Sequence, residues 1–256
     1  MTKPLRLVQL TDLHLMADSD ALYRGVDSRS HFLAALQQAL SLEPELLLLT
    51  GDLAEQVQPE TYAWLYQQLQ ATGLAWQWLP GNHDSVELMQ SFKPAHFELS
   101  LAGWQLLSLN TSLPGEAAGW LAASELERLS QALAVQRPTL IALHHHPLPV
   151  GSAWMDALGL KNAAALWEVL QAADQPRVLL CGHVHQAASW QHLGASVYAT
   201  PATSVQFRPQ VEQFQLATQA QPGLRWLDIQ PSGHWQTQLV HFSVEFTHRR
   251  RGQGCG

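Results

Sequence analysis

The chain contains 256 residues, of which 46% are hydrophobic and 14% are charged. This length suits one domain, or at most two small ones, with room for a full hydrophobic core. There are 14 Lys and Arg against 21 Asp and Glu, a formal net charge of -7, so no basic field exists to hold a nucleic-acid backbone. The apolar stretches are far shorter than the ~20 residues that cross a bilayer, which excludes a membrane-spanning helix.

The N-terminus and the cysteines indicate the cell compartment. The first residues lead directly into a strand-like run, without the apolar stretch and cleavage site of a signal peptide. Two cysteines, Cys181 and Cys255, are too few for a disulfide framework. We therefore expect a cytoplasmic protein, with one domain over residues 1–248 and a disordered tail over residues 249–256.

Short apolar runs bounded by polar residues predict buried strands. In chain order these runs are 5–10, 46–49, 75–79, 104–109, 139–143 and 178–181. Between several of them, apolar residues at three- and four-residue spacing predict helices over 30–42, 60–70, 124–135 and 163–172. This alternation is typical of an α/β layered domain. A further strand at 97–101 predicts a hairpin with 104–109, and hence a mixed sheet.

The pattern changes after residue 187. Strands are predicted at 196–199, 213–217, 224–229 and 235–242, and no long amphipathic helix separates them. We expect these strands to form a second, antiparallel sheet.

Polar residues follow five of the predicted strands at their carboxyl ends, where open α/β sheets bind ligands. They are Asp12 and His14, Gly51-Asp52, Gly81-Asn82-His83-Asp84, His144-His145-His146-Pro147 and Gly182-His183-Val184-His185. Carboxylate, imidazole and amide groups without thiolate suit Fe, Mn, Co or Zn, and argue against a structural cysteine-rich zinc site. These groups supply enough ligands for two metal ions if one carboxylate bridges the ions, and we choose Asp52 as the bridge.

The spacing of these residues has a physical meaning. In an extended segment residues two apart point the same way, so Asp12 with His14, and His183 with His185, can each present two ligands. The glycines before Asp52, Asn82 and His183 allow tight turns and close backbone approach. A single strand-end Asp more often caps a helix or closes a turn, and a His triplet usually contains packed members. The joint occurrence of five such groups favours a common site over these structural roles.

These motifs resemble the signature of the calcineurin-like metallophosphoesterases, which runs D-x-H, G-D, G-N-H-D/E, H and G-H-x-H. Every block is present, between residues 5 and 202. The residues around the blocks are most similar to those of bacterial class III 3′,5′-cyclic-AMP phosphodiesterases, in the segments 9–15, 78–84, 144–149, 180–186 and 199–207. The resemblance implies a four-layer α/β/β/α sandwich of two mixed sheets flanked by helices.

The resemblance also implies a ligand set. One metal ion would be held by Asp12, His14, Asp52 and His185, and the other by Asp52, Asn82, His145 and His183. Within the triplet His145 is selected because the family histidine usually stands two residues before a proline, here Pro147. Iron with manganese, or two irons, is expected, with cobalt or zinc as alternatives.

Catalytic and substrate-binding roles follow from the same resemblance. His83 would be the catalytic proton donor, and Asp84 would orient its ring and raise its basicity. The substrate-binding residues would be His14, Asp52, Asn82, His83 and His185. Apart from the resemblance, residues 23–26, the loop after Asn110-Thr111 and residues 203–207 are candidates to contact a nucleobase, with turn or packing roles as the alternative.

The implied reaction is hydrolysis of 3′,5′-cyclic AMP to 5′-AMP. Two metal ions lower the pKa of a bridging water toward ~7, the hydroxide attacks phosphorus in line, and His83 protonates the departing 3′-oxygen. The alternatives are another phosphodiester or a nucleotide as the substrate, or a non-catalytic scaffold of the same fold. The expected partner is a small cyclic nucleotide, with no nucleic acid and no membrane, and the sequence leaves open whether the chain forms a homodimer.

Overall fold

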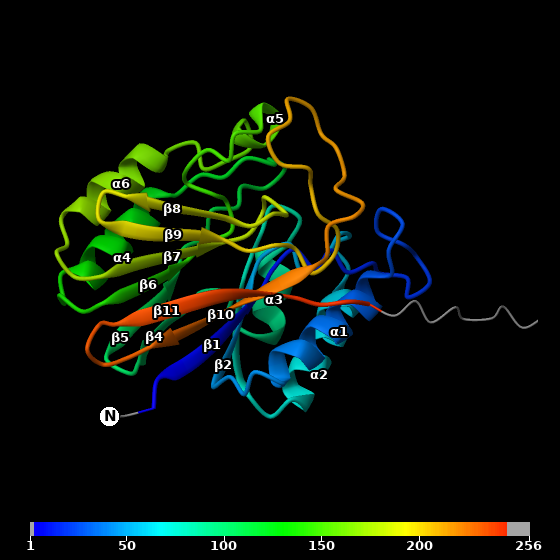
Figure 1. Ribbon diagram of the computed structural model, residues 1–256, viewed down its shortest axis with the longest axis horizontal. Helices are drawn as coiled ribbons and strands as arrows, with labels where there is room; N and C mark the ends of the chain where they lie inside the picture. Colours follow the sequence, from blue (N-terminus) through cyan, green and yellow to red (C-terminus); the bar gives the residue numbers. More distant parts are fainter. Residues whose placement is uncertain (1–2, 245–256) are drawn as a thin grey trace, which may run out of the picture.

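Two β-sheets packed face to face form the centre of the molecule, and helices cover both outer faces (Figure 1). The computed structural model describes residues 3–244. The tail predicted at 249–256 lies outside the described residues. Two central sheets with helices outside them give four layers in the order α/β/β/α, which confirms the fold expected from the sequence.

The first sheet has the strand order β11-β10-β1-β2-β3. Its strands are β1 (Leu5–Leu10), β2 (Leu46–Thr50), β3 (Ala75–Leu79), β10 (Gly223–Ile229) and β11 (Trp235–His241). Strands β1, β2 and β3 run parallel, whereas β10 pairs antiparallel with β1, with Leu7 opposite Leu227. The sheet is therefore mixed.

The second sheet has the order β4-β5-β6-β7-β9-β8. Its strands are β4 (Glu98–Leu101), β5 (Trp104–Ser108), β6 (Thr139–Ala142), β7 (Arg177–Cys181), β8 (Ala188–His192) and β9 (Ala195–Ala199). Strands β5, β6, β7 and β9 are parallel, and the edge strands β4 and β8 are antiparallel to their neighbours. The predicted hairpin of β4 and β5 is confirmed.

The hydrophobic cores lie between these layers. Leu7 and Leu46 of the first sheet pack with Leu140 of the second in the core between the sheets. Their neighbours Val8 and Leu47 point to the opposite face and pack against helices. Because both faces of each central strand are covered, the strands have the continuous apolar sequences by which they were predicted.

Within residues 3–244, three helices cover each sheet. Helices α1 (Ser28–Leu40), α2 (Pro59–Ala71) and α3 (Val86–Phe92) pack on the first sheet, and α4 (Ala123–Leu133), α5 (Ala153–Asp156) and α6 (Ala163–Gln171) pack on the second. Helix α1 begins two residues before its predicted start because the Asp27 side chain accepts hydrogen bonds from the backbone amides of Arg29 and Ser30. Helices α3 and α5 are too short for a period to show in the sequence. No helix in the described part of the chain is long and apolar enough to span a membrane.

The C-terminal strands differ from the prediction. Strands β8 and β9 extend the second sheet and β10 and β11 extend the first, so within residues 3–244 these strands form no sheet of their own. The predicted strand at 213–217 is reduced to an isolated bridge between Phe207 and Leu216. Strand β8 is an edge strand with half-buried and exposed residues in alternation, and it lacks the apolar run that marks the central strands.

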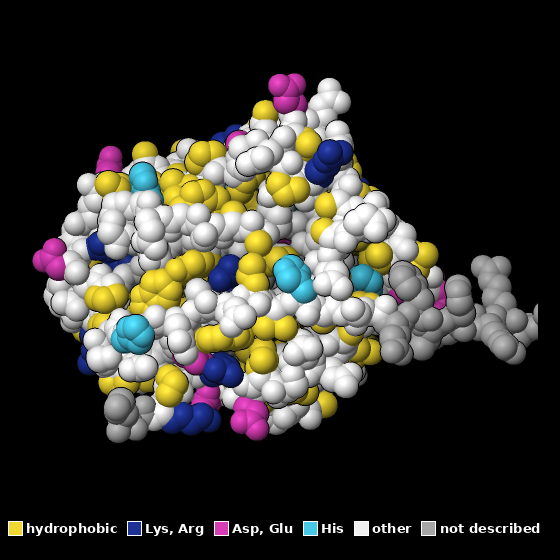
Figure 2. Space-filling view, viewed as in Figure 1, with side chains coloured by type: hydrophobic (Ala, Val, Ile, Leu, Met, Phe, Trp, Pro, Cys, Tyr) yellow, Lys and Arg dark blue, Asp and Glu magenta, His cyan; other side chains and the backbone are white. Residues whose placement is uncertain are grey.

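Buried polar contacts tie the two sheets together at the edge where the parallel strands end. Gln9 Nε2 at the end of β1 donates to Cys181 O of β7 at 3.1 Å, and Thr200 Oγ1 donates to Gln9 Oε1 at 2.7 Å. The loops after β1, β2, β3, β6 and β7 therefore emerge beside one another. On the face seen in Figure 2, Lys and Arg are scattered among other side chains and form no basic patch.

Candidate metal centre

The Asp and His residues predicted to bind metal lie in a buried cluster at this edge, in the loops after β1, β2, β6 and β7. The described chain has eleven non-glycine residues with positive φ, and five of them belong to the cluster: Asp12, His14, Asp52, His183 and His185. Such left-handed residues cost up to about 1–3 kcal/mol each and concentrate at functional sites. The structure thus corrects the predicted reason for the two-residue spacing, because left-handed turns and not extended backbone turn the paired side chains into the cluster.

The first group of donor atoms comes from Asp12, His14, Asp52 and His185. The Nε2 atoms of His14 and His185 are 3.1 Å apart, and His185 Nε2 is 3.4 Å from Asp12 Oδ1. His14 Nε2 is 3.6 Å from Asp52 Oδ2. Ligand atoms that bond one ion at about 2.0–2.2 Å lie about 3.0–3.6 Å from each other. The observed separations therefore match atoms that share an ion.

Hydrogen bonds on the far side of each ring fix this orientation. His14 Nδ1 lies 2.8 Å from Glu55 Oε2, and His185 Nδ1 donates to Val205 O at 2.7 Å. Aromatic rings support the same two imidazoles: Tyr23 stacks on His14 and Phe207 on His185, with ring centroids 4.4 Å and 3.9 Å apart. Both Nε2 atoms are thus turned inward and held there.

The second group of donor atoms surrounds His144. Its Nε2 atom is 3.4 Å from Asp52 Oδ2 and 3.3 Å from His183 Nδ1. Its Nδ1 atom donates to Thr50 O at 2.8 Å, which turns Nε2 toward Asp52. Since Asp52 Oδ2 faces both His14 and His144, one carboxylate oxygen adjoins both groups.

The His triplet is arranged differently from the prediction. His145 was selected from the sequence, and its ligand nitrogen does lie within 4.8 Å of those of His144 and His183. However, His145 Nδ1 pairs with Thr111 Oγ1 at 2.7 Å, and it is His144 that approaches Asp52. His144 is therefore the member of the triplet next to the carboxylate, and His145 lies with His183 in the same group.

Burial and neighbouring charges set the protonation of the cluster. Burial lowers the pKa of His183 and of His145 well below the usual value, so both imidazoles are neutral. Burial alone would raise the pKa of Asp52, but the charge of His144 outweighs burial and holds that pKa well below its usual range. Despite its burial, His144 has its pKa raised to about 9 by Asp52, so a cation arriving there would displace its proton. Ionised carboxylates and neutral imidazoles are the forms that bind metal.

The residues present fit metal ions on a second ground. Buried polar atoms normally have hydrogen-bond partners. Within the described chain the buried atom Asn82 Oδ1 has none, which leaves this oxygen available to a metal ion. An oxygen and nitrogen donor set without thiolate suits Fe, Mn, Co or Zn.

His83 lies at the rim of the cluster, with 38% of its side chain exposed. Its backbone amide donates to Asp52 Oδ1 at 3.0 Å, and its Nδ1 is 3.2 Å from Glu55 Oε2. Because Nδ1 faces Glu55, Nε2 is the nitrogen free to exchange a proton with a bound molecule. Glu55 therefore contacts both His14 and His83, although no motif in the sequence marks it.

Asp84 does not make the contact with His83 that the sequence suggested. Its carboxylate accepts hydrogen bonds from the amides of Leu53 and Ala54 at 3.1 Å, from the Gly81 amide at 2.9 Å and from the Tyr62 hydroxyl at 3.0 Å. Burial, reinforced by the Asp52 charge, raises the pKa of Asp84 to about 6. Asp84 thus ties the loop after β2 to the loop after β3, and Glu55 is the carboxylate that faces His83.

Two glycines permit the close approach of these loops. A Cβ atom at Gly81 would overlap Asp52 Oδ1, and one at Gly182 would overlap Thr11 Oγ1. Both positions therefore require glycine for the packing of the loop, as the sequence predicts.

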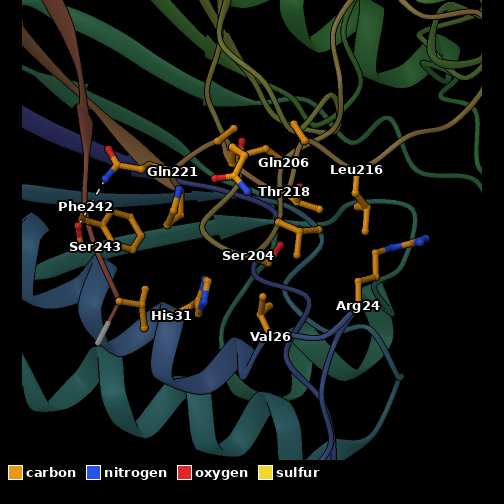
Figure 3. Close-up of a pocket in the computed structure, with 16 residues that line it drawn as sticks. Arg24, Val26, His31, Ser204, Gln206, Leu216, Thr218, Gln221, Phe242 and Ser243 are labelled. Atoms are coloured by element: carbon orange, nitrogen blue, oxygen red, sulfur yellow. Dashed lines mark hydrogen bonds between the residues drawn. The ribbon is translucent and has the colours of Figure 1, made fainter. Parts of the chain in front are cut away.

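Two cavities border the loop at residues 203–207, and the second of them reaches the cluster at His185. The first, of about 390 Å³, is lined by residues of the loop 203–206. Arg24 lies at one end of this cavity, and His31 and Phe242 lie toward the other end (Figure 3). The second, of about 560 Å³, reaches His185 and Phe207. The predicted lining segments 23–26 and 203–207 both border the first cavity, whereas His83 borders neither.

Together, the four-layer fold and the Asp/His cluster, whose side chains could hold metal ions, define a metallophosphoesterase. Residues 5–187 match the model of the calcineurin-like phosphoesterase family, and the chain belongs to this family. A 3′,5′-cyclic adenosine monophosphate phosphodiesterase, CpdA, of Vibrio vulnificus is 36% identical over 246 residues, covering 92% of this chain and 89% of the relative. A 3′,5′-cyclic-nucleotide phosphodiesterase of Nostoc is 35% identical over 245 residues, covering 92% of each chain.

The fold is also similar to that of a solved dimetal phosphatase from Danio rerio. The TM-score is 0.67 at 12% sequence identity, and the alignment covers 94% of this chain and 100% of that one. At this identity the likeness concerns the fold alone.

Proposed function

We propose that this chain hydrolyses 3′,5′-cyclic AMP to 5′-AMP. The observation that carries the proposal is the position of Asp52 Oδ2, which lies 3.6 Å from His14 Nε2 and 3.4 Å from His144 Nε2, between two groups of donor atoms. Such a shared carboxylate suits a two-metal site for phosphate esters. The relatives from Vibrio vulnificus and Nostoc, whose names state cyclic nucleotides, support this choice among the phosphate esters.

We assign the Asp and His ligands by the distances between their donor atoms, and Asn82 by its buried, unpartnered Oδ1. Asp12, His14, Asp52 and His185 would hold one ion, and Asp52, Asn82, His144 and His183 the other. His144 here replaces His145 of the sequence prediction. Iron with manganese, or two irons, remains our expectation for the metals. When bound, two such ions supply a nucleophilic hydroxide at neutral pH and neutralise charge on the phosphoryl oxygens.

The protein's own residues handle the leaving group. As the bond between phosphorus and the ribose 3′-oxygen breaks, that oxygen needs a proton, and His83 Nε2 donates it. Glu55 accepts the hydrogen bond from Nδ1 of the same ring, 3.2 Å away, and so keeps Nε2 directed outward. His14, Asp52, Asn82 and His185 contact the substrate together with His83. The half-exposed position of His83 at the rim is consistent with contact to a substrate entering from solvent.

We also propose that the enzyme acts in the cytoplasm. Cys181 is a buried free thiol, as expected for a chain folded in a reducing compartment. Burial raises the pKa of this thiol, so Cys181 is not a nucleophile.

The substrate is tested with a panel of phosphodiesters and defined metals. Hydrolysis rates are measured on cyclic AMP, cyclic GMP, glycerophosphocholine and a bis-aryl phosphate, with wild type and Asp52→Asn. We expect kcat/KM to be highest for cyclic AMP, and Asp52→Asn to lose at least about a hundredfold in rate on every substrate. A preference for glycerophosphocholine would identify a different phosphodiesterase, and no hydrolysis of any ester by the metal-loaded protein would reject the enzyme altogether.

A further inference from the structure

A chain of aromatic contacts leads from the two inward-facing imidazoles to the surface. Arg24 follows Tyr23, which stacks on His14, and the Arg24 guanidinium carbon lies 4.6 Å from the ring centroid of Phe214. Phe214 in turn meets Phe207 at 5.1 Å, and Phe207 stacks on His185. Arg24 and Phe214 thus form the outer end of a chain of contacts whose inner members, His14 and His185, are two candidate metal ligands.

The outer pair is accessible. Phe214 is 40% exposed and lies on the rim hairpin, which we define as residues 207–216, and Arg24 is exposed. In Figure 3 the Arg24 side chain points away from the end of the cavity that holds His31. The Arg24 guanidinium carbon also lies 5.5 Å from the ring centroid of Tyr23, so two aromatic rings hold the guanidinium in place. The exposed part of such a guanidinium can stack on the ring of a ligand or donate to it.

Arg24 is held in place for this role. Its Nε atom donates to the Tyr23 hydroxyl at 3.2 Å, and its backbone is left-handed, with φ of 47°. The nearby Arg29 differs, because one of its terminal nitrogens donates to the carbonyls of Met16 and Ala17 and its guanidinium lies over Trp64. Arg24 therefore offers an ordered guanidinium at the rim, whereas Arg29 is committed to the fold.

We propose that Arg24 and Phe214 bind the nucleobase of the cyclic nucleotide, with the base stacked on the guanidinium that Phe214 supports. This inference rests on the proposed function. The metal ions recognise the phosphate, which all phosphate esters share, so binding energy specific to a nucleotide must come from contacts to the base. Stacking of a base on an aromatic or guanidinium surface contributes about 1–3 kcal/mol and accepts either purine, while the Arg24 nitrogens can donate to acceptors on the base edge.

Trp120 provides a matched control. It is 47% exposed and lies on the loop after β5, near the cluster, where its amide donates to Thr111 O. Among the described residues no Lys or Arg lies over its ring, and no stacked group connects it to His14 or His185. Trp120 is therefore an exposed aromatic residue of the same region without the features on which the proposal stands.

The test compares cyclic AMP with the methyl riboside 3′,5′-cyclic phosphate, which has the same reacting ring and no base. The variants are Arg24→Met, Phe214→Ala, Phe214→Tyr and Trp120→Ala, each checked for metal content and melting temperature. For Arg24→Met and Phe214→Ala we expect KM for cyclic AMP to rise about tenfold, with kcat within about twofold. The ratio of kcat/KM between the two substrates should fall accordingly. Phe214→Tyr and Trp120→Ala should keep the wild-type ratio.

The outcomes separate the two proposals. Equal effects of Arg24→Met on both substrates would mean that Arg24 only supports the fold. A fall of the ratio of kcat/KM between the two substrates in Trp120→Ala alone would mean that the base binds at the loop after β5. Either result would overturn the proposed nucleobase site at Arg24 and Phe214, but it would leave the proposed hydrolysis of cyclic AMP unaffected. If wild type hydrolyses neither cyclic phosphate but does hydrolyse other diesters, the proposed function itself fails.

Discussion

At the residue scale, the hydrogen bond from His144 Nδ1 to Thr50 O has the largest consequence for the assignment of ligands. It crosses from the second sheet to the first at 2.8 Å and leaves His144 Nε2 facing Asp52. His145, next along the chain, pairs its Nδ1 with Thr111 Oγ1, and its ring centroid lies 4.6 Å from that of His183. Two adjacent histidines thus have different surroundings, and their variants should behave differently.

We expect His144→Ala to lose about one metal ion per chain and at least about a hundredfold in turnover, because a ligand is removed. His145→Ala should retain both ions. The measurement is bound metal by elemental analysis alongside cyclic AMP hydrolysis, with folding checked by circular dichroism. Loss of metal in His145→Ala and its retention in His144→Ala would restore the assignment made from the sequence.

Glu55 is the second residue with a testable role. Its Oε2 atom lies 2.8 Å from His14 Nδ1 and 3.2 Å from His83 Nδ1. Burial alone would raise the pKa of Glu55, but the hydrogen bond from His14 outweighs burial and lowers it, so the side chain is ionised near neutral pH.

We expect Glu55→Gln to slow cyclic AMP hydrolysis about 10–100-fold, because His83 loses the partner that orients its ring. The loss should be smaller for a bis-aryl phosphate, whose leaving group needs little help from a proton donor. Both rates are measured, together with bound metal. Equal losses on the two substrates would show that Glu55 acts through the metal ligand His14 and not through His83.

At the scale of elements, β10 is tied to β1 by a charged pair as well as by backbone pairing. Arg6 Nε and Nη2 donate to the two carboxylate oxygens of Asp228 at 2.7 and 2.8 Å. Hydrogen bonds from Arg6, and also from Gln236, lower the pKa of Asp228. The folded pKa lies below the unfolded value, so the pair stabilises the fold above about pH 4, and the stabilisation is lost as pH falls through the folded pKa.

We expect Asp228→Asn to lower the free energy of unfolding by about 1–3 kcal/mol at pH 7. The difference from wild type should shrink as pH falls from 4 toward 2, where wild type also loses the charge. Urea unfolding at a series of pH values measures both quantities. A difference independent of pH would mean that packing, and not the charge of Asp228, produces the effect.

Sequence periodicity predicts the central strands and the long helices because their burial produces a clear pattern of apolar residues. Strand β2 is buried on both faces and has a continuous apolar run, whereas α2 is buried on one face and has apolar residues at helical spacing. Strand β8 is not predicted from the sequence, because an edge strand is partly exposed and does not require the apolar run that marks a central strand. The division of the C-terminal strands between two sheets depends on long-range pairing, such as Leu7 with Leu227, which no local pattern encodes.

For the site, the motifs identify the Asp and His residues that gather in the cluster, since chemistry restricts the residue types. They do not distinguish His144 from His145, because that choice depends on where each ring turns after β6. They also miss Glu55 and misjudge Asp84, because the contacts of a loop carboxylate are decided by the fold of two loops at once. The sequence thus predicts which residue types form the site, but it does not predict the direction in which each side chain points.

At the scale of the whole molecule, the cluster joins two sheets that otherwise meet through an apolar core. Asp12 and Asp52 follow strands of the first sheet, and His144 and His183 follow strands of the second. An ion bound only by the folded chain at a hundred times its dissociation constant contributes about 2.7 kcal/mol to stability. Metal binding should therefore both activate the protein and stabilise the packing of its two halves.

Stepwise return of metal to stripped protein tests the central claim most directly. The metal is removed with a chelator, manganese or iron is added back in increments, and bound metal, melting temperature and cyclic AMP hydrolysis are measured at each step. We expect no hydrolysis without metal, full hydrolysis at two ions per chain with a raised melting temperature, and no recovery in Asp52→Asn. Undiminished hydrolysis by metal-free protein, or full activity of Asp52→Asn, would contradict the account.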